Sequence, residues 1–138
     1  MSANDTQVAG THYRTSYQHW DLAADLKLGY FEGQISKYVT RHRTKKGKED
    51  LEKALHFTQK LLEMSKSYGH KPQRLFPTAL QMDDFVKANC LNLREHVLLK
   101  KLLSWVNERD LIDVVTFLQV LITSEYGGEP PPGYVNQG

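Results

Sequence analysis

Residues 31–57 read FEGQISKYVTRHRTKKGKEDLEKALHF, and this basic stretch sets the organisation of the chain. No acidic residue stands between Glu32 and Glu49, whereas six of the chain's 18 lysines and arginines fall within the 12 residues from 37 to 48. A solvated helix face usually mixes charges of both signs. A cluster of one sign repels itself, and an anionic partner relieves that repulsion. The stretch therefore predicts a site for an anion.

Two side-chain stripes follow the period of an α-helix over residues 31–44. The core-facing stripe consists of Phe31, Ile35, Tyr38, Val39 and His42. A neighbouring stripe of long polar side chains consists of Gln34, Lys37, Arg41 and Lys45. Gly47 can adopt a positive φ that ends this helix and turns the chain into the next one. The spacing thus separates apolar contacts from a row of donors.

The whole chain has the composition of one globular domain. Its 138 residues, 40% of them apolar, can bury a core without staples. A net charge of only +2 argues against a general polyanion binder, and the single cysteine, Cys90, excludes a disulfide framework or a cysteine-based zinc site. The first residues lack the pattern of a signal peptide, and the longest apolar run, 114–122, is too short to span a bilayer. We expect a cytoplasmic protein without a membrane partner.

Periodicity and breaker residues predict an all-α fold, a compact bundle of about six helices. The expected helices cover 17–28, 31–44, 48–68, 79–89, 93–107 and 109–126. An extended arm (1–15) precedes this single helical domain (16–126), and a Pro/Gly-rich tail (127–138) follows it. The last helix is apolar nearly all round, which favours burial on several sides or a contact in a homo-oligomer.

A faint echo at an offset of 60 residues links the third and sixth expected helices. Asp50-Leu51, Phe57, Gln59 and Leu61 align with Asp110-Leu111, Phe117, Gln119 and Leu121. Two similar three-helix halves explain the echo, and so does chance similarity between two amphipathic helices. If the halves are real, residues 16–69 bind the anion and residues 79–126 pack or oligomerise.

Phosphate groups suit the basic cluster as ligands. Lysine and arginine side chains one turn apart grip neighbouring phosphate oxygens. The N-terminus of the helix after Gly47 adds free backbone donors, and Tyr38 or Tyr13 offers a ring for stacking on a base. An ordinary solvated basic helix end accounts for the same composition. The predicted nucleotide-binding residues are His12, Tyr13, Gln34, Lys37, Tyr38, Arg41, Arg43, Lys45, Lys46 and Gly47.

Acidic residues directly after the basic cluster suggest a metal beside the phosphates. Glu49 and Asp50 can hold Mg²⁺ that arrives with a nucleotide. Acids at a helix start are more often explained by their favourable interaction with the helix dipole. The chain has no Walker A loop and no dinucleotide fingerprint, and its six histidines show no metal-ligand spacing. Catalytic residues are not assigned.

Three sequence elements together carry a resemblance. They are Thr11-His12-Tyr13, a core with Phe31, Gly33, Lys37, Tyr38, Arg41 and Lys45, and Asp50-Leu51 with Lys53-Ala54. Over about residues 10–63 this pattern resembles that of the phage SaV-like family of small proteins, which includes a coliphage nucleotide kinase. Gln34 stands where that family usually has Asn, and His42-Arg43-Thr44 replaces its small residues. The resemblance implies a phage protein of the infected bacterial cell with a nucleotide-sized ligand.

Three functions fit these observations. The first is a P-loop-free nucleotide kinase-like protein that acts on nucleoside monophosphates. The second is a non-catalytic sponge that sequesters a nucleotide or cyclic nucleotide used in host immune signalling, as an anti-defence protein. The third, ranked last because the net charge is low, is nucleic-acid binding, for which a steep salt dependence is the signature.

Overall fold

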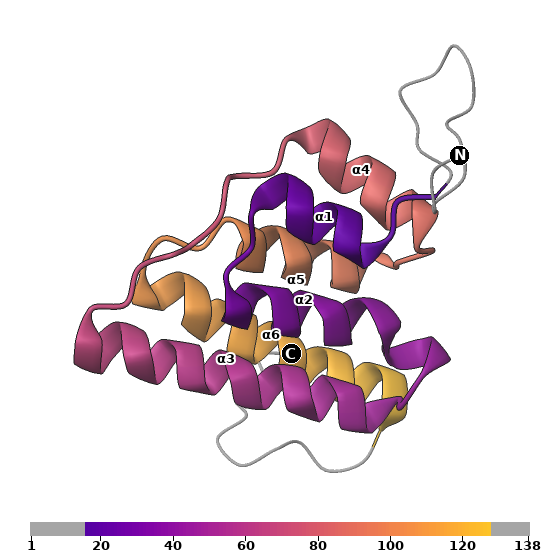
Figure 1. Cartoon of the computed structure of the whole chain (residues 1–138). Helices are drawn as coiled ribbons and strands as arrows, with labels where there is room; N and C mark the ends of the chain where they lie inside the picture. Colours follow the sequence, from indigo (N-terminus) through magenta and orange to yellow (C-terminus); the bar gives the residue numbers. More distant parts are fainter. Residues whose placement is uncertain (1–15, 128–138) are drawn as a thin grey trace.

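Figure 1 shows the fold of the computed structural model, which describes residues 16–127. Within this range the chain forms six α-helices and one 3₁₀ turn and contains no strand. The elements are α1 (His19–Leu26), α2 (Tyr30–Arg41), η1 (His42–Thr44), α3 (Lys48–Tyr68), α4 (Ala79–Ala88), α5 (Leu93–Leu103) and α6 (Glu108–Tyr126). The predicted all-α bundle of about six helices is confirmed. The predicted arm 1–15, with His12 and Tyr13, lies outside the described residues, as do residues 128–138.

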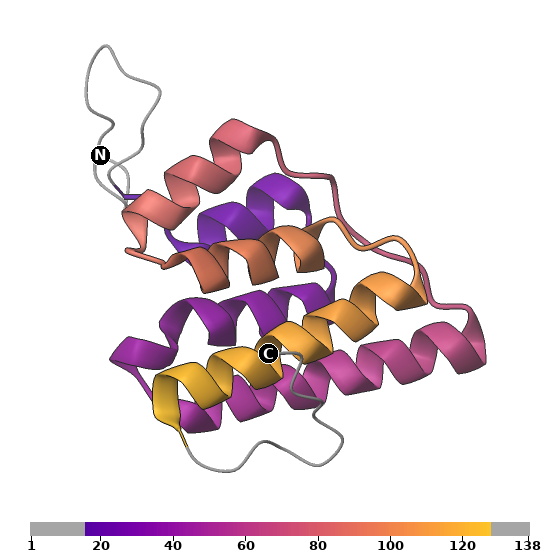
Figure 2. The same cartoon turned by 180° about the vertical axis from the view of Figure 1, so that it is seen from behind.

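The six helices lie in three layers of two (Figures 1 and 2). Helices α1 and α4 form the outer layer, α2 and α5 the middle layer, and α3 and α6 the far layer. The four longer helices also pack as a closed ring, because α2 contacts α3 and α5, and α6 contacts the same two helices. The core fills the space between α2, α3, α5 and α6 and continues under α1 and α4, which contribute Leu22, Leu26, Met82 and Phe85.

In each layer, a helix from the first half of the chain lies beside the corresponding helix from the second half: α1 with α4, α2 with α5 and α3 with α6. The helix lengths run 8, 12 and 21 residues and then 10, 11 and 19 residues. Helix α4 begins 60 residues after α1 (79 against 19), and α6 begins 60 residues after α3 (108 against 48). The order and length of the helices match the expectation of two similar halves, and chance similarity between amphipathic helices stays the alternative explanation of the echo.

Local chemistry explains several helix ends. The side chains of Thr78, Asn92 and Asn107 each accept a hydrogen bond from the backbone N–H three residues on, as N-caps do. Gly69 ends α3 at φ 65° and ψ 25°, the left-handed conformation that glycine adopts without strain. Gly47 has φ 61° and allows the tight turn into α3.

The predicted helix over 31–44 is too long. The α-helix ends at Arg41, and His42–Thr44 wind into a 3₁₀ turn, which has three residues per turn instead of 3.6. Lys45 follows with φ −126° and ψ −102°, outside helical geometry. The predicted donor stripe of α2 therefore stops at Arg41. Helix α1 also ends before the predicted residue 28, because Lys27 takes the left-handed conformation after Leu26.

Helix α6 is buried on one side and leaves part of its apolar surface open within the described residues. Leu111, Val114, Leu118 and Leu121 are buried, whereas Ile112 is exposed. Beside α5 its outer side forms an open groove of about 350 Å³, lined by Leu93, Arg94, Val97, Thr116, Phe117 and Val120. Across residues 16–127 no helix is both long and apolar enough to cross a membrane.

A buried acid fixes the middle layer. Glu32 on α2 is 1% exposed and accepts a hydrogen bond of 2.8 Å from the indole N–H of Trp105, which follows α5. The backbone N–H of Gln73 approaches the same carboxylate at 3.5 Å. A buried carboxylate needs such donors, because burying it without hydrogen bonds lowers the stability of the fold by roughly several kcal/mol. Glu32 thereby ties α2 to the loop after α3 and to the end of α5.

Candidate functional site

Three cations converge on one aromatic ring where α2 meets α3. The Nζ of Lys37 lies 4.7 Å from the centre of the Tyr38 ring, the guanidinium carbon of Arg41 4.9 Å, and the Nζ of Lys53 5.6 Å. The Tyr38 ring is stacked on Phe57 of α3, with centroids 6.0 Å apart and an interplanar angle of 17°. We name Lys37, Tyr38, Arg41, Lys53 and Phe57 the cation–aromatic cluster. It gathers positive charge around a half-buried ring.

Asp50 connects this cluster to the turn between the helices. Its buried carboxylate accepts hydrogen bonds from Arg41 Nη2 at 3.1 Å and Nε at 3.3 Å, and from the Lys46 backbone N–H at 3.0 Å. Burial alone raises the pKa of Asp50, but these hydrogen bonds and the nearby positive charges lower it overall. Asp50 thus stays ionised and orients the Arg41 guanidinium.

The turn that follows presents further cations. Lys45, Lys46 and Lys48 are all exposed, and Gly47 stands between them at the start of α3. A Cβ on Gly47 would lie 3.5 Å from the Tyr126 ring and 3.6 Å from its hydroxyl oxygen, so the end of α6 packs directly against this turn. We name residues 45–48 the basic turn.

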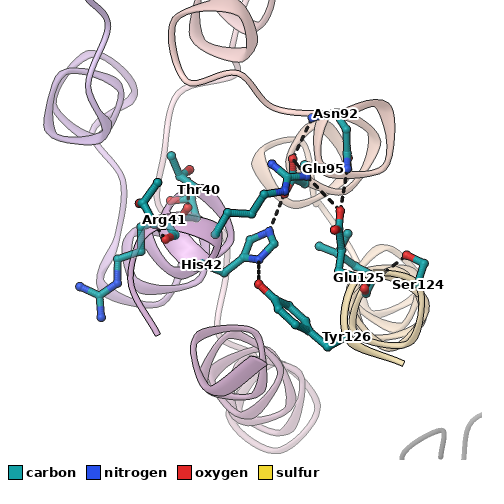
Figure 3. A network of polar contacts seen from close by, with 12 residues as sticks. Thr40, Arg41, His42, Asn92, Glu95, Ser124, Glu125 and Tyr126 are labelled. Atoms are coloured by element: carbon teal, nitrogen blue, oxygen red, sulfur yellow. Dashed lines mark hydrogen bonds and ion pairs between the residues drawn. The ribbon is translucent and has the colours of Figure 1, made fainter. Parts of the chain in front are cut away.

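A buried hydrogen-bonded chain lies on the other side of α2 (Figure 3). His42 Nε2 lies 2.5 Å from Glu95 Oε2, and both side chains have no exposed surface. His42 Nδ1 lies 2.6 Å from the hydroxyl of Tyr126, a residue that is 37% exposed. Figure 3 shows Arg41 and His42 pointing to opposite sides of the helix. The chain runs from a buried carboxylate through a buried imidazole to a phenol near the surface.

Arg43 forms ion pairs with two carboxylates beside this hydrogen-bonded chain. Its Nη2 lies 2.8 Å from Glu95 Oε1 and 3.0 Å from Glu125 Oε1. Asn92 donates to the same Glu125 oxygen at 2.8 Å, and its backbone N–H donates to Glu95 at 2.8 Å. The hydrogen bond from Arg43 is the main cause of the lowered pKa of Glu125. Burial is the main cause of the raised pKa of Tyr126, with Glu125 adding to it.

The structure brings together only some of the predicted nucleotide-binding residues. Lys37, Tyr38 and Arg41 share the cation–aromatic cluster, and Lys45, Lys46 and Gly47 form the basic turn beside it. Gln34 is half-buried, and its Oε1 is a buried acceptor without a hydrogen-bond partner. Arg43 differs, because its guanidinium is held by two carboxylates from α5 and α6.

The two predicted metal ligands are not equivalent. Glu49 is exposed, whereas the buried Asp50 carboxylate is already bound by Arg41 and the backbone of Lys46. Among residues 16–127 no group of three or more histidine, cysteine or acidic side chains is arranged to hold a metal ion. A nucleotide's Mg²⁺ would thus take most of its ligands from phosphates and water.

Several site residues lack a strong sequence signal. Lys53 and Phe57 lie four residues apart on α3, and only the packing of α3 on α2 places them beside Tyr38. Glu95 reads as the N3 residue of a capping box with Asn92, which hides its second role toward His42. Tyr126 follows a long apolar helix and precedes Gly127, so it reads as a helix end.

Comparisons of the chain with family models, with curated proteins and with solved structures found no match. The resemblance of residues 10–63 to the phage SaV-like family therefore stays a prediction.

Proposed function

We propose that this chain is a phage-encoded nucleotide-binding protein, with a nucleotide kinase-like activity as its first candidate reaction. The observation that carries the proposal is the convergence of Lys37, Arg41 and Lys53 on the Tyr38 ring. Cations held this close repel one another, and a phosphate group relieves the repulsion. Arg41 is oriented in advance by Asp50, which lowers the entropy lost when its guanidinium binds phosphate oxygens.

The basic turn extends this surface toward a longer phosphate chain. Its three lysines are exposed and are separated from the cluster only by the short segment after α2. In this proposal the base and sugar lie near Tyr38, and the phosphates run past Arg41 toward Lys45, Lys46 and Lys48. Phosphoryl transfer asks mainly for positioning and charge neutralisation, which such a surface supplies without a P-loop.

A second candidate is sequestration of a signalling nucleotide without turnover. The engagement of Asp50 by Arg41 favours it, because that carboxylate is then occupied as a support for the binding arginine. A cyclic or linear nucleotide would bind the same cluster and leave unchanged. Nucleic-acid binding through the same cations is the third and weakest candidate.

Binding to nucleotides tests the proposal directly. Titration calorimetry with ATP, deoxynucleoside monophosphates and cyclic nucleotides is expected to show saturable binding by the wild-type protein. Lys37→Ala should weaken it about 10–100-fold, the range for loss of one charge-assisted hydrogen bond. Lys66→Ala, which removes an exposed lysine from the last turn of α3, is the matched control and should bind like the wild type.

Product analysis separates the candidate functions. Incubation with ATP, Mg²⁺ and each deoxynucleoside monophosphate yields the diphosphate if the protein is a kinase. Recovery of the intact ligand after denaturation indicates sequestration. Binding to DNA or RNA that falls steeply with salt, without binding to any mononucleotide, would contradict the nucleotide site.

A further inference from the structure

We infer that Tyr126 is a nucleophile that accepts a phosphoryl group from a nucleoside triphosphate bound at the basic turn. The inference rests on the proposed function and adds a covalent step to it. Its starting point is the order of the groups in Figure 3, where the Glu95 carboxylate and the Tyr126 hydroxyl lie within hydrogen-bond distance of opposite nitrogens of the His42 imidazole. A hydroxyl nucleophile, a base that takes its proton, and a third group that orients the base form the usual arrangement for covalent catalysis.

Burial separates the three groups into supporting and reacting parts. The side chains of His42 and Glu95 are inaccessible to solvent, so they can act only through Tyr126. Tyr126 alone reaches the surface, at 37% exposure, and its ring packs against Gly47 in the basic turn. A phosphate chain gripped by the turn's lysines would therefore lie beside the phenol. His42 and Glu95 are positioning residues in this scheme.

Tyr126 needs a base to act as a nucleophile, because a tyrosine phenol is protonated at neutral pH. Burial, followed by the nearby carboxylates, raises the pKa of this phenol further. In the tautomer whose Nε2–H donates to Glu95, His42 Nδ1 accepts the phenolic proton. Glu95 stabilises the imidazolium that forms, and Arg43 beside Glu95 holds that carboxylate in place.

The reaction balances in two steps. In the first, the Tyr126 oxygen bonds to the γ-phosphorus, the bond from that phosphorus to the β-phosphate oxygen breaks, and the nucleoside diphosphate leaves with the electron pair. The phenolic proton moves to His42. In the second step, a phosphate oxygen of a nucleoside monophosphate attacks the phosphotyrosine, the bond to Tyr126 breaks, and His42 returns the proton.

A covalent intermediate also removes a geometric demand on the kinase hypothesis. Direct transfer requires donor and acceptor nucleotides to be bound at the same time in two subsites. With a phosphotyrosine, the cation–aromatic cluster and the basic turn serve donor and acceptor in turn. Ping-pong kinetics are the expected signature.

The test is phosphoryl labelling of the full chain by ATP that carries a labelled γ-phosphate, with Mg²⁺ and no acceptor. Peptide mass spectrometry of the wild-type protein should place the label on Tyr126, and added deoxynucleoside monophosphate should remove it as the diphosphate. Tyr126→Phe should lose the label. Tyr68→Phe, which alters a tyrosine that is 77% exposed at the far end of α3, should keep it.

The outcomes distinguish this inference from the proposed function. Nucleotide binding by the wild-type protein without a label on Tyr126 overturns the inference and leaves the nucleotide site standing. A label that persists in Tyr126→Phe also overturns the inference and leaves the nucleotide site standing. Failure of the wild-type protein to bind any nucleotide overturns both. Because the mapping uses the wild-type chain, the result holds even if Tyr126→Phe folds poorly.

Discussion

Two glycines at the start of α2 lead to opposite predictions for the same substitution. Gly33 lies inside the helix, and a Cβ built on it meets no atom within 4 Å. Gly29 is the N-cap, and its Cβ would lie 2.9 Å from Glu32 Oε1 and 3.0 Å from the Cβ of Gln73. Replacement by alanine therefore tests which factor decides the change in the free energy of unfolding at each position: the backbone entropy of glycine or the space for a methyl group.

The expected magnitudes follow from these surroundings. Gly33→Ala should raise the free energy of unfolding by about 0.5–1 kcal/mol, because alanine loses less backbone entropy in a helix interior. Gly29→Ala should lower it by about 1–3 kcal/mol, the usual cost of forcing an extra methyl group into a packed site. Glu32 cannot simply turn aside, since its other carboxylate oxygen holds the Trp105 indole.

Urea denaturation followed by circular dichroism measures both effects. Unchanged m-values would show that the variants differ in stability and not in the compactness of the unfolded state. A destabilised Gly33→Ala variant would refute the open space at that residue, and a neutral Gly29→Ala variant would refute the close contact with Glu32. Gly33→Ala should also be titrated with nucleotide, because a ligand that docks closely on α2 beside Lys37 would fill the same space and bind less tightly.

Three further predictions concern buried groups and backbone strain. Glu95→Gln should lower the unfolding free energy by about 2–3 kcal/mol in urea titrations, because a charge-assisted hydrogen bond to His42 is lost; an unchanged midpoint would contradict this. Burial and, secondarily, Lys37 lower the pKa of His19 to about 4, from 6.5. The neutral form is therefore favoured on folding, and stability should fall by roughly 2–3 kcal/mol as pH drops from 6.5 to 4. His19→Gln, which can still donate to Ser36, should flatten that pH dependence, and an equally steep profile would disprove the assignment. Cys90 has φ 54°, which glycine adopts more easily than cysteine. Cys90→Gly should therefore raise the free energy of unfolding by about 0.5 kcal/mol and the melting temperature slightly; a lower melting temperature would argue against this.

Local signals predicted the helices well and their exact ends less well. Gly69 ends α3, and Thr78 and Asn92 cap α4 and α5, at positions where turn and cap chemistry depends on neighbouring residues alone. The helical period predicts Lys45 on the donor stripe of α2, whereas its backbone lies outside helical geometry. His42, where the chain changes from α to 3₁₀ geometry, is hydrogen-bonded to residues 53 and 84 positions away, and a local sequence pattern does not contain such distant contacts.

The same limit applies to the candidate site. The basic stripe over Lys37 and Arg41 was visible in the sequence, and it does line one surface. Arg43 looked like another phosphate ligand because it belongs to the same charged run. Its pairing with Glu95 and Glu125 depends on how α5 and α6 pack against η1, and the periodicity of a single helix contains no information on its partners.

The contact of Tyr126 with His42 also bears on the order in which this protein assembles. The two residues are 84 positions apart, and Arg43 and Glu125 are 82 apart. Helices α2 and α3 are neighbours in sequence and can pair early, since closing a short loop costs little entropy. The imidazole of His42 gains its full set of partners only after α6 has been synthesised. A nascent chain without α6 would therefore carry the cation–aromatic cluster and the basic turn on one hairpin, while His42 still lacks its hydrogen-bond partner Tyr126.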